Sequence, residues 1–179
     1  MTMTHPKRTP NFKKDLKIGA DGEATFQRRF QVAITKESGK GRDFTVSNKV
    51  GSGLELKTDT YDSKNFFFER WSDVTNQKPG GPWQANAHSK YLAYYFVNKN
   101  IYYLFDLATL VPFLEKYIAE KKPRPIEVRN RKYTTVGYAL PIADFEHLAL
   151  HYSSLNGLTN PEPEEGYIPC GGKNQRTKN

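Results

Sequence analysis

Apolar and polar residues alternate in two short runs, residues 42–46 and 54–58, which flank a glycine-containing turn. Alternate side chains of a β-strand share one face, so this pattern is typical of a strand with one buried face. The two runs therefore predict a β-hairpin. Leu54 and Leu56 would point to one of its faces, and the charged residues would point to the other.

The charged face of this hairpin carries Asp43, Glu55 and Lys57. A turn centred near Val50 would place Asp43 opposite Lys57 and Thr45 opposite Glu55. Any register that pairs odd-numbered residues keeps the three charged side chains on one face. Two carboxylates and an ammonium group that converge in this way can hold a hard divalent cation and a phosphate. The alternative is a solvent-exposed face on which Glu55 and Lys57 form a weak surface pair.

A helix is predicted from Asp21, a residue type suited to an N-cap, to about Ile34. Phe26, Phe30 and Ile34 recur on one stripe of this helix. Glu23 shares the inward stripe one turn from the helix start, where a carboxylate is unusual. Two interpretations stay open: Glu23 reaches a catalytic site, or it is an exposed first-turn acid stabilised by the helix dipole.

Hydrophobic periodicity and turn residues predict the remaining elements. The predicted strands cover residues 65–71, 101–105 and 133–140. The predicted helices cover residues 84–96, 107–118 (capped by Asp106) and 141–150, and residues 120–132 form a charged connector. This order predicts an α/β or mixed α+β fold with a sheet flanked by helices. We divide the chain into a flexible basic arm (1–17), one domain (18–155) and a disordered tail (156–179).

The composition adds a strongly basic balance to this picture. The 179 residues include 27 Lys and Arg against 19 Asp and Glu, which gives a net charge of +8. A polyanionic partner is favoured, because neutralisation of phosphates by Lys and Arg supplies most of the non-specific affinity for nucleic acids. A basic surface without such a partner is the other interpretation.

Several classes of protein are excluded by the same sequence. Its one cysteine, Cys170, cannot form an intramolecular disulfide framework. No run approaches the roughly 18 apolar residues of a membrane span, so a membrane partner is not expected. The polar N-terminal residues lack the apolar segment of a secretory signal, which indicates a cytoplasmic location. A phosphate-binding Walker motif is absent, so ATP hydrolysis is not indicated.

Hydrolysis of a phosphodiester sets chemical requirements that the charged hairpin face meets. Mg²⁺ takes oxygen ligands, usually one or two carboxylates, and keeps several waters. Asp43 and Glu55 are candidate metal ligands, and the carbonyl of Leu56 is a candidate third. Lys57 is the candidate catalytic group, which would orient the attacking water or stabilise charge on the phosphate. Glu23 would act from the first helix, through a water or on a second ion.

This arrangement resembles the PD-(D/E)XK nuclease superfamily, which includes restriction endonucleases, archaeal-type Holliday junction resolvases and phage nucleases. The resemblance rests on Glu23, Asp43 and the triplet Glu55-Leu56-Lys57, and it covers roughly residues 20–106. It implies a central mixed sheet flanked by helices and Mg²⁺-dependent cleavage of DNA, with Mn²⁺ as a substitute. It also implies metal-binding roles for Asp43 and Glu55 and a catalytic role for Lys57.

One departure from the superfamily is Arg42, which stands where a proline often precedes the aspartate. The small size and basic ends are similar to those of phage-encoded nucleases. Structure-selective cleavage of branched DNA, which would imply a homodimer, is the leading hypothesis within the family, and sequence-specific cleavage is the other. A non-catalytic DNA-binding or inhibitory protein that keeps the fold is the alternative from a different class, and an RNA-directed nuclease is a third.

Accessory residues are predicted around the site. Asp59 continues its charged face and would bind an outer water, or would only solvate the strand end. Gln84 and His88 follow a glycine- and proline-rich loop and could face the scissile phosphate, although a lone histidine is more often a surface or packing residue. Glu69 is interpreted as a structural partner of Arg70 or of another cation.

The predicted DNA contacts are basic residues of the arm and the connector. A solvated run of charges is the alternative reading for each of them. These residues are Lys13, Lys14, Lys121, Lys122, Arg124, Arg129, Arg131 and Lys132.

Overall fold

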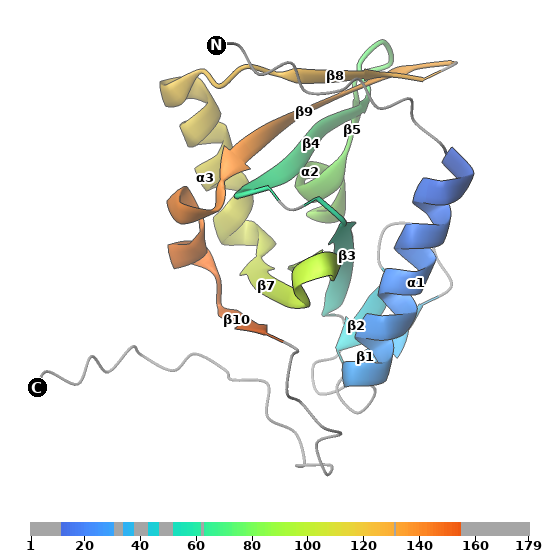
Figure 1. The fold of residues 1–179 in the computed structure, drawn as a ribbon. Helices are drawn as coiled ribbons and strands as arrows, with labels where there is room; N and C mark the ends of the chain where they lie inside the picture. The colour runs from blue at the N-terminus through green and yellow to red at the C-terminus, as the bar shows by residue number, and fades with distance from the viewer. Residues whose placement is uncertain are drawn as a thin grey trace, which may run out of the picture.

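The chain forms a mixed α+β fold that is built on two β-sheets (Figure 1). The computed structural model describes residues 12–30, 34–37, 43–46, 52–61, 63–130 and 132–154. One sheet has six strands in the order β1 (Ile34–Lys36), β2 (Phe44–Val46), β3 (Gly53–Asp59), β6 (Tyr91–Phe96), β7 (Ile101–Asp106) and β10 (His151–Ser154). Strands β3 and β6 are parallel, and their neighbours are antiparallel.

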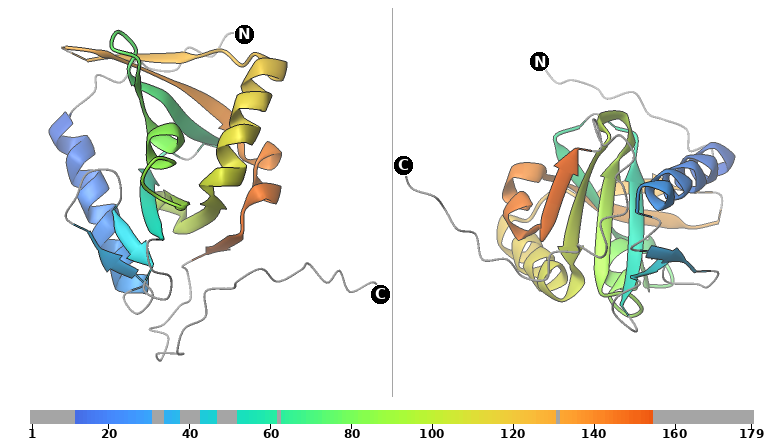
Figure 2. Two further views of the ribbon diagram at one scale, coloured as in Figure 1. Left: turned by 180° about the vertical axis from the view of Figure 1, so that it is seen from behind. Right: turned by 90° about the horizontal axis from the view of Figure 1, so that it is seen from below.

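The second sheet is antiparallel throughout. Its order is β5 (Lys78–Pro79), β4 (Asn65–Asp73), β9 (Thr134–Pro141) and β8 (Ile126–Arg129). The helices are α1 (Phe12–Phe30), α2 (Gly81–Ala85) and α3 (Leu107–Lys121), and the 3-10 turns are η1 (Val97–Lys99), η2 (Ile142–Asp144) and η3 (Glu146–Leu148). Helix α1 packs beside β1 and β3, and α3 packs beside β7 (Figure 2).

Two apolar clusters cover the two faces of the six-stranded sheet. Phe26 of α1 packs with Phe44, Leu54 and Leu56 on one face. On the other face, aromatic and leucine side chains of β4, β6, β7 and α3 form a larger cluster around Phe66. Strand β6 contributes alternate residues to both clusters, and all six of its residues are buried. The charged residues of β3 lie on the face directed toward the second sheet.

The predicted helix over residues 84–96 is wrong, because this segment contains the end of α2 and the whole of β6. Tyr91, Ala93 and Tyr95 pack on one face and Leu92, Tyr94 and Phe96 on the other. A strand buried on both faces shows no alternation of polar and apolar residues, so its sequence does not distinguish it from a buried helix.

The first helix also differs from its prediction. It begins at Phe12 and ends at Phe30, so residues 12–17 of the predicted flexible arm are helical, Asp21 is an interior residue, and Ile34 begins β1. Two prolines, Pro6 and Pro10, disfavour a helix in the first part of the predicted arm, but both precede residue 12, and the lysines that follow them are good helix formers. Residues 1–11 and the predicted tail over 156–179 lie outside the described residues.

Two further segments differ from expectation. The predicted connector over 120–132 contains β8, an exposed edge strand whose backbone pairs with β9. Charged side chains are common on such edges, and they concealed the strand. Two 3-10 turns take the place of the helix predicted over 141–150. Strand β10 follows them and pairs with β7. The strands predicted over 65–71, 101–105 and 133–140 are confirmed as β4, β7 and β9.

The predicted cap of α3 is confirmed, because the Asp106 carboxylate accepts a hydrogen bond of 2.8 Å from the Ala108 N–H. Such a bond satisfies one of the backbone donors that the start of a helix leaves unpaired. Pro112 lies inside this helix.

A close approach of α1 to β3 is possible because residue 22 is glycine. A Cβ at Gly22 would lie 2.2 Å from Cγ2 of Thr58, whereas a Cβ at Gly19 would meet nothing within 4 Å. We expect Gly22→Ala to lower the free energy of unfolding by about 1–3 kcal/mol, because overpacking forces the helix away from the strand. Gly19→Ala should raise it by about 0.5–1 kcal/mol through the ordinary helix preference for alanine.

Urea unfolding of both variants measures this difference between neighbouring sites of one helix. Equal stabilisation by the two substitutions would show that α1 does not lie against β3 at Gly22.

Candidate active site

The hairpin brings Asp43 and Glu55 together beside the part of β3 that extends beyond its pairing with β2, where β3 has a local edge. Observed pairs are Phe44 with Leu54 and Thr45 with Gly53. This register is shifted by two residues from the one expected for a turn near Val50, but it still pairs odd-numbered residues. The charged residues consequently stay on the face opposite Leu54 and Leu56, as the alternation predicted.

Asp43 is fixed at the point where β2 begins. Its backbone N–H donates to the Leu54 carbonyl (3.1 Å), and its Oδ2 accepts from the Leu56 N–H (2.7 Å). The N–H and C=O of one strand residue point to the same neighbouring strand. The Leu56 carbonyl is therefore directed to the edge at which the Asp43 carboxylate lies, while the Leu56 side chain is buried on the other face.

Three carboxylates influence one another through their charges. Burial raises the pKa of Glu55 from 4.5 to about 7, with further contributions from Asp43 and Glu23, while Lys57 opposes the shift. Burial also raises the pKa of Asp43, the hydrogen bond from Leu56 lowers it, Glu23 raises it and Lys36 lowers it. A concentration of negative charge that is largely shielded from water is favourable for binding a cation.

Glu23 reaches this edge from α1 and forms an ion pair with Lys36 of β1, at 2.8 Å between Oε2 and Nζ. The hydrogen bond and the charge of Glu23 raise the pKa of Lys36. Lys36 was not predicted as a site residue, because it lies between the segments predicted as the first helix and the hairpin. Glu23 thus lies near Asp43 and Glu55 with a cation of its own, at a position in the middle of the helix rather than in its first turn.

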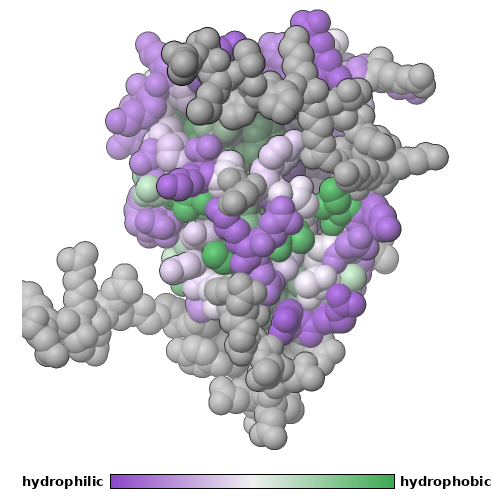
Figure 3. Space-filling view, in the orientation of Figure 1, coloured by the Kyte–Doolittle hydropathy of each residue, from purple (hydrophilic) through white to green (hydrophobic). Residues whose placement is uncertain are grey.

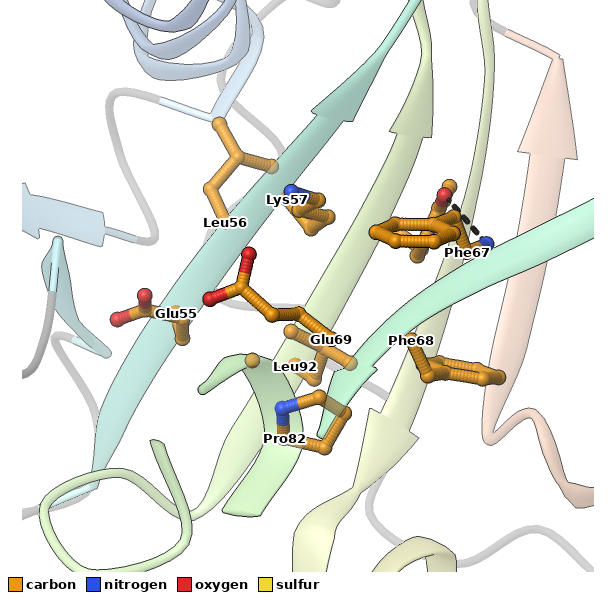
Figure 4. Close-up of a pocket in the computed structure, with 10 residues that line it drawn as sticks. Glu55, Leu56, Lys57, Phe67, Phe68, Glu69, Pro82 and Leu92 are labelled. Atoms are coloured by element: carbon orange, nitrogen blue, oxygen red, sulfur yellow. Dashed lines mark hydrogen bonds between the residues drawn. The ribbon is translucent and has the colours of Figure 1, made fainter. Parts of the chain in front are cut away.

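Lys57 lines a small cavity between the two sheets (Figure 4). The cavity has a volume of about 30 Å³, is lined by Glu55, Lys57 and Glu69, and has Pro82 and Tyr94 among its other walls. This space suffices for at least one water-sized ligand. Lys57 and Glu55 therefore line a common, largely apolar cavity from the strand face that the sequence predicted they would share, and Glu69 joins them from the other sheet.

The candidate metal centre offers few protein ligands. No group of three or more His, Cys, Asp or Glu side chains within the described parts of the chain is arranged to hold a metal ion. Mg²⁺ commonly uses one or two carboxylates and completes its shell with waters and substrate phosphate. Asp43, Glu55 and the Leu56 carbonyl are oxygen donors of the type that this ion prefers.

The three predicted accessory residues, Asp59, Gln84 and His88, lie in different parts of the structure. Asp59 accepts hydrogen bonds from the Tyr94 hydroxyl and from the Tyr61 N–H, both at 2.7 Å. These bonds anchor the end of β3, and the Tyr94 hydroxyl in turn accepts from the Phe67 N–H at 2.9 Å. Gln84 lies half-buried on α2, and His88 is exposed in the turn that follows.

Arg70 does not take the expected role as partner of Glu69. Its guanidinium forms a 3.1 Å ion pair with Glu115 and lies 4.6 and 4.8 Å from the ring centres of Trp71 and Trp83. The Trp83 Nε1–H donates to Glu115 at 2.7 Å, so this group ties α2 to α3. The cations that lower the pKa of Glu69 are Lys57 and Lys78.

Most of the predicted DNA contacts of the connector are exposed side chains at the end of α3, along β8 and just after it, and we call them the basic surface. In Figure 1, β8 runs from α3 toward the side on which α1 lies, and Figure 3 shows hydrophilic side chains over the end of α3. Lys13 and Lys14 lie in α1, and Arg131 lies outside the described residues. The exposed members are Lys121, Lys122, Arg124, Arg129 and Lys132.

Comparison with protein-family models, with curated proteins and with solved structures returns no match to this chain. Among the described helices, none has the length and apolarity required to cross a lipid bilayer. The geometry and charge of the site are thus the grounds on which its function is assigned.

Proposed function

We propose that this protein is a Mg²⁺-dependent deoxyribonuclease with a site of the PD-(D/E)XK type. The observation that carries the proposal is the joint position of Asp43 and Glu55 at the edge of β2 and β3, with Lys57 on the same face. The raised pKa values of both acids support it, because a bound divalent cation would offset the cost of keeping two charged carboxylates together.

Each residue has a role in this proposal. Asp43, Glu55 and the carbonyl of Leu56 would hold the ion, which polarises a phosphate and makes water a better nucleophile at neutral pH. The Lys57 ammonium would orient the attacking water or stabilise the charge that develops on the phosphate. Water would add to phosphorus and release a proton to solvent as the bond to the 3′ oxygen breaks. The departing 3′ oxygen would take up a proton from solvent, which leaves a 5′-phosphate and a 3′-hydroxyl. Glu23 would adjust the charge of the site from α1.

Cleavage of a substrate panel tests this proposal. Supercoiled plasmid, linear duplex, a four-way junction and an RNA of matched length are incubated with the protein, with Mg²⁺ or Mn²⁺ and with a chelator. We expect metal-dependent cleavage of DNA, with preference for the junction if the protein acts as a homodimer on branched DNA. Tight DNA binding with no cleavage of any substrate would instead support a non-catalytic DNA-binding or inhibitory protein, and preferential cleavage of RNA would overturn the assignment to DNA.

The basic surface formed by α3 and β8 is proposed to contact DNA phosphates. Replacing the exposed Arg124 and Arg129 together by alanine should reduce the slope of log K against log salt concentration by about two, one for each lost phosphate contact. Fluorescence anisotropy with labelled DNA over a series of salt concentrations measures this slope. Lys64→Ala combined with Lys90→Ala removes the same charge outside α3 and β8, and an equal effect of the two pairs would show that only net charge matters.

A further inference from the structure

Glu69 brings another carboxylate to the cavity from a different sheet. It lies on β4, whereas Glu55 and Lys57 lie on β3, and all three line the same space. Figure 4 shows its carboxylate pointing toward Glu55 and Lys57. Burial raises the pKa of Glu69, and the charge of Lys57 is the first of the effects that oppose this shift. The side chain is thus held close to the cavity rather than extended into solvent.

The loop before α2 fixes the position of this carboxylate. A Cβ at Gly80 would lie 2.4 Å from Oε1 of Glu69, and a Cβ at Gly81 would lie 2.9 Å from its backbone oxygen. Gly80 has an extended backbone (φ −126°), so it is needed for space and not for conformation. Gly81 has φ +42°, which glycine adopts without strain. The loop therefore closes on Glu69 and leaves its carboxylate little freedom.

We propose that Glu69 is a positioning residue whose charge attracts the Lys57 ammonium across the cavity, away from the metal-binding carboxylate of Glu55. Lysine has a long flexible side chain, so its charge needs a fixed partner to keep one place. Lys57 attracts both Glu55 and Glu69. Without Glu69, the ammonium would pair with Glu55 alone, where it would compete with the cation and lie away from the substrate phosphate. This inference rests on the proposed function.

Steady-state cleavage by Glu69→Gln tests the inference, with Glu146→Gln as the control for an exposed glutamate that is replaced in the same way. We expect kcat to fall by about 10- to 100-fold, the usual loss when a group that orients a functional side chain is removed, with KM within about 2-fold. Glu69→Asp, which keeps the charge, should recover part of the loss. Gly80→Ala should lower kcat in the same direction, because its methyl group displaces the carboxylate.

A double-mutant cycle separates positioning of Lys57 from other roles. In a Lys57→Ala background, Glu69→Gln should change kcat by less than about 2-fold, because the group that Glu69 positions is gone. An undiminished loss in that background would show that Glu69 acts independently of Lys57 and would overturn the inference, as would an unchanged kcat of Glu69→Gln alone.

A second readout does not depend on cleavage. Acylation of lysines in the metal-free protein, mapped by mass spectrometry, should modify Lys57 several-fold faster in Glu69→Gln than in the wild type, because an ammonium that has lost its carboxylate partner moves more freely and meets the reagent more often, with exposed Lys64 as the internal reference. Equal rates would overturn the inference even if the wild type cleaves no DNA. Failure of the wild type to cleave, together with faster acylation of Lys57, would instead contradict only the proposed function.

Discussion

Lys57→Ala should lower Mg²⁺-dependent DNA cleavage by about 10²- to 10³-fold, with little change in DNA affinity. The size follows from the loss of one fixed charge that stabilises a transition state in a partly enclosed site. Asp43→Asn should reduce cleavage at least as strongly, because the amide is a poor ligand for Mg²⁺ but can still accept the hydrogen bond from Leu56. Initial rates on the best substrate of the panel, at saturating metal, give both values.

Matched substitutions at exposed positions control for changes in charge. Lys64→Ala and Asp21→Asn alter the same residue types outside the cavity and should retain nearly full activity. Circular dichroism spectra should show that all four variants are folded. Full activity of both Lys57→Ala and Asp43→Asn would remove this site from the reaction.

The relation of Asp43, Glu55 and Lys57 could be predicted from sequence because the side-chain period of a strand is two. The register differed by two residues from the expected one, and the three side chains still share a face. A shift by an even number preserves the face, whereas a shift by one would have buried the charges. The cap at Asp106 was equally local, because its acceptor and donor are two residues apart.

Features that depend on contacts between distant segments could not be predicted in the same way. Strand β6 has no alternation because neighbouring layers bury both of its faces, so Tyr91 and Tyr95 mimic the spacing of a helix. Glu69 enters the cavity through the packing of β4 against the six-stranded sheet. Its neighbours in sequence are aromatic residues and Arg70, and none of them indicates that Lys57 lies opposite.

The parallel pairing of β3 with β6 explains how a short hairpin becomes a rigid support for the site. Residues 54–59 pair in register with residues 91–96, so β3 is an interior strand and not the edge of an isolated hairpin. Asp43 is bonded to this strand through two backbone groups. An isolated hairpin has marginal stability in water, and interior pairing supplies the stability that it lacks. Groups on rigid elements keep the geometry that metal binding and catalysis need.

Glu55→Gln should have opposite effects on activity and stability. We expect it to abolish most of the cleavage and to raise the free energy of unfolding of the metal-free protein by about 2 kcal/mol at about pH 8. The reason is that the pKa of Glu55 is raised from 4.5 to about 7 in the folded protein. Protonated Glu55 therefore adds to the stability of the folded protein. This contribution is fully present below about pH 4.5 and is lost as the pH rises through about 7. Glutamine carries no charge and avoids that loss.

Urea unfolding at several pH values, in the presence of a chelator, measures the difference between Glu55→Gln and the wild type. The gap should be small near pH 4.5, widen up to about pH 7 and stay constant above it, since Glu55 is then ionised in both states. Adding Mg²⁺ should stabilise the wild type and not the variant, because a ligand of the native state raises stability only where it binds. Glu146→Gln should show neither effect. A gap that does not change with pH would mean that Glu55 is an ordinary surface carboxylate. A destabilised Glu55→Gln would mean that the charge of Glu55 is already compensated in the metal-free protein. Either result would contradict the acidic site.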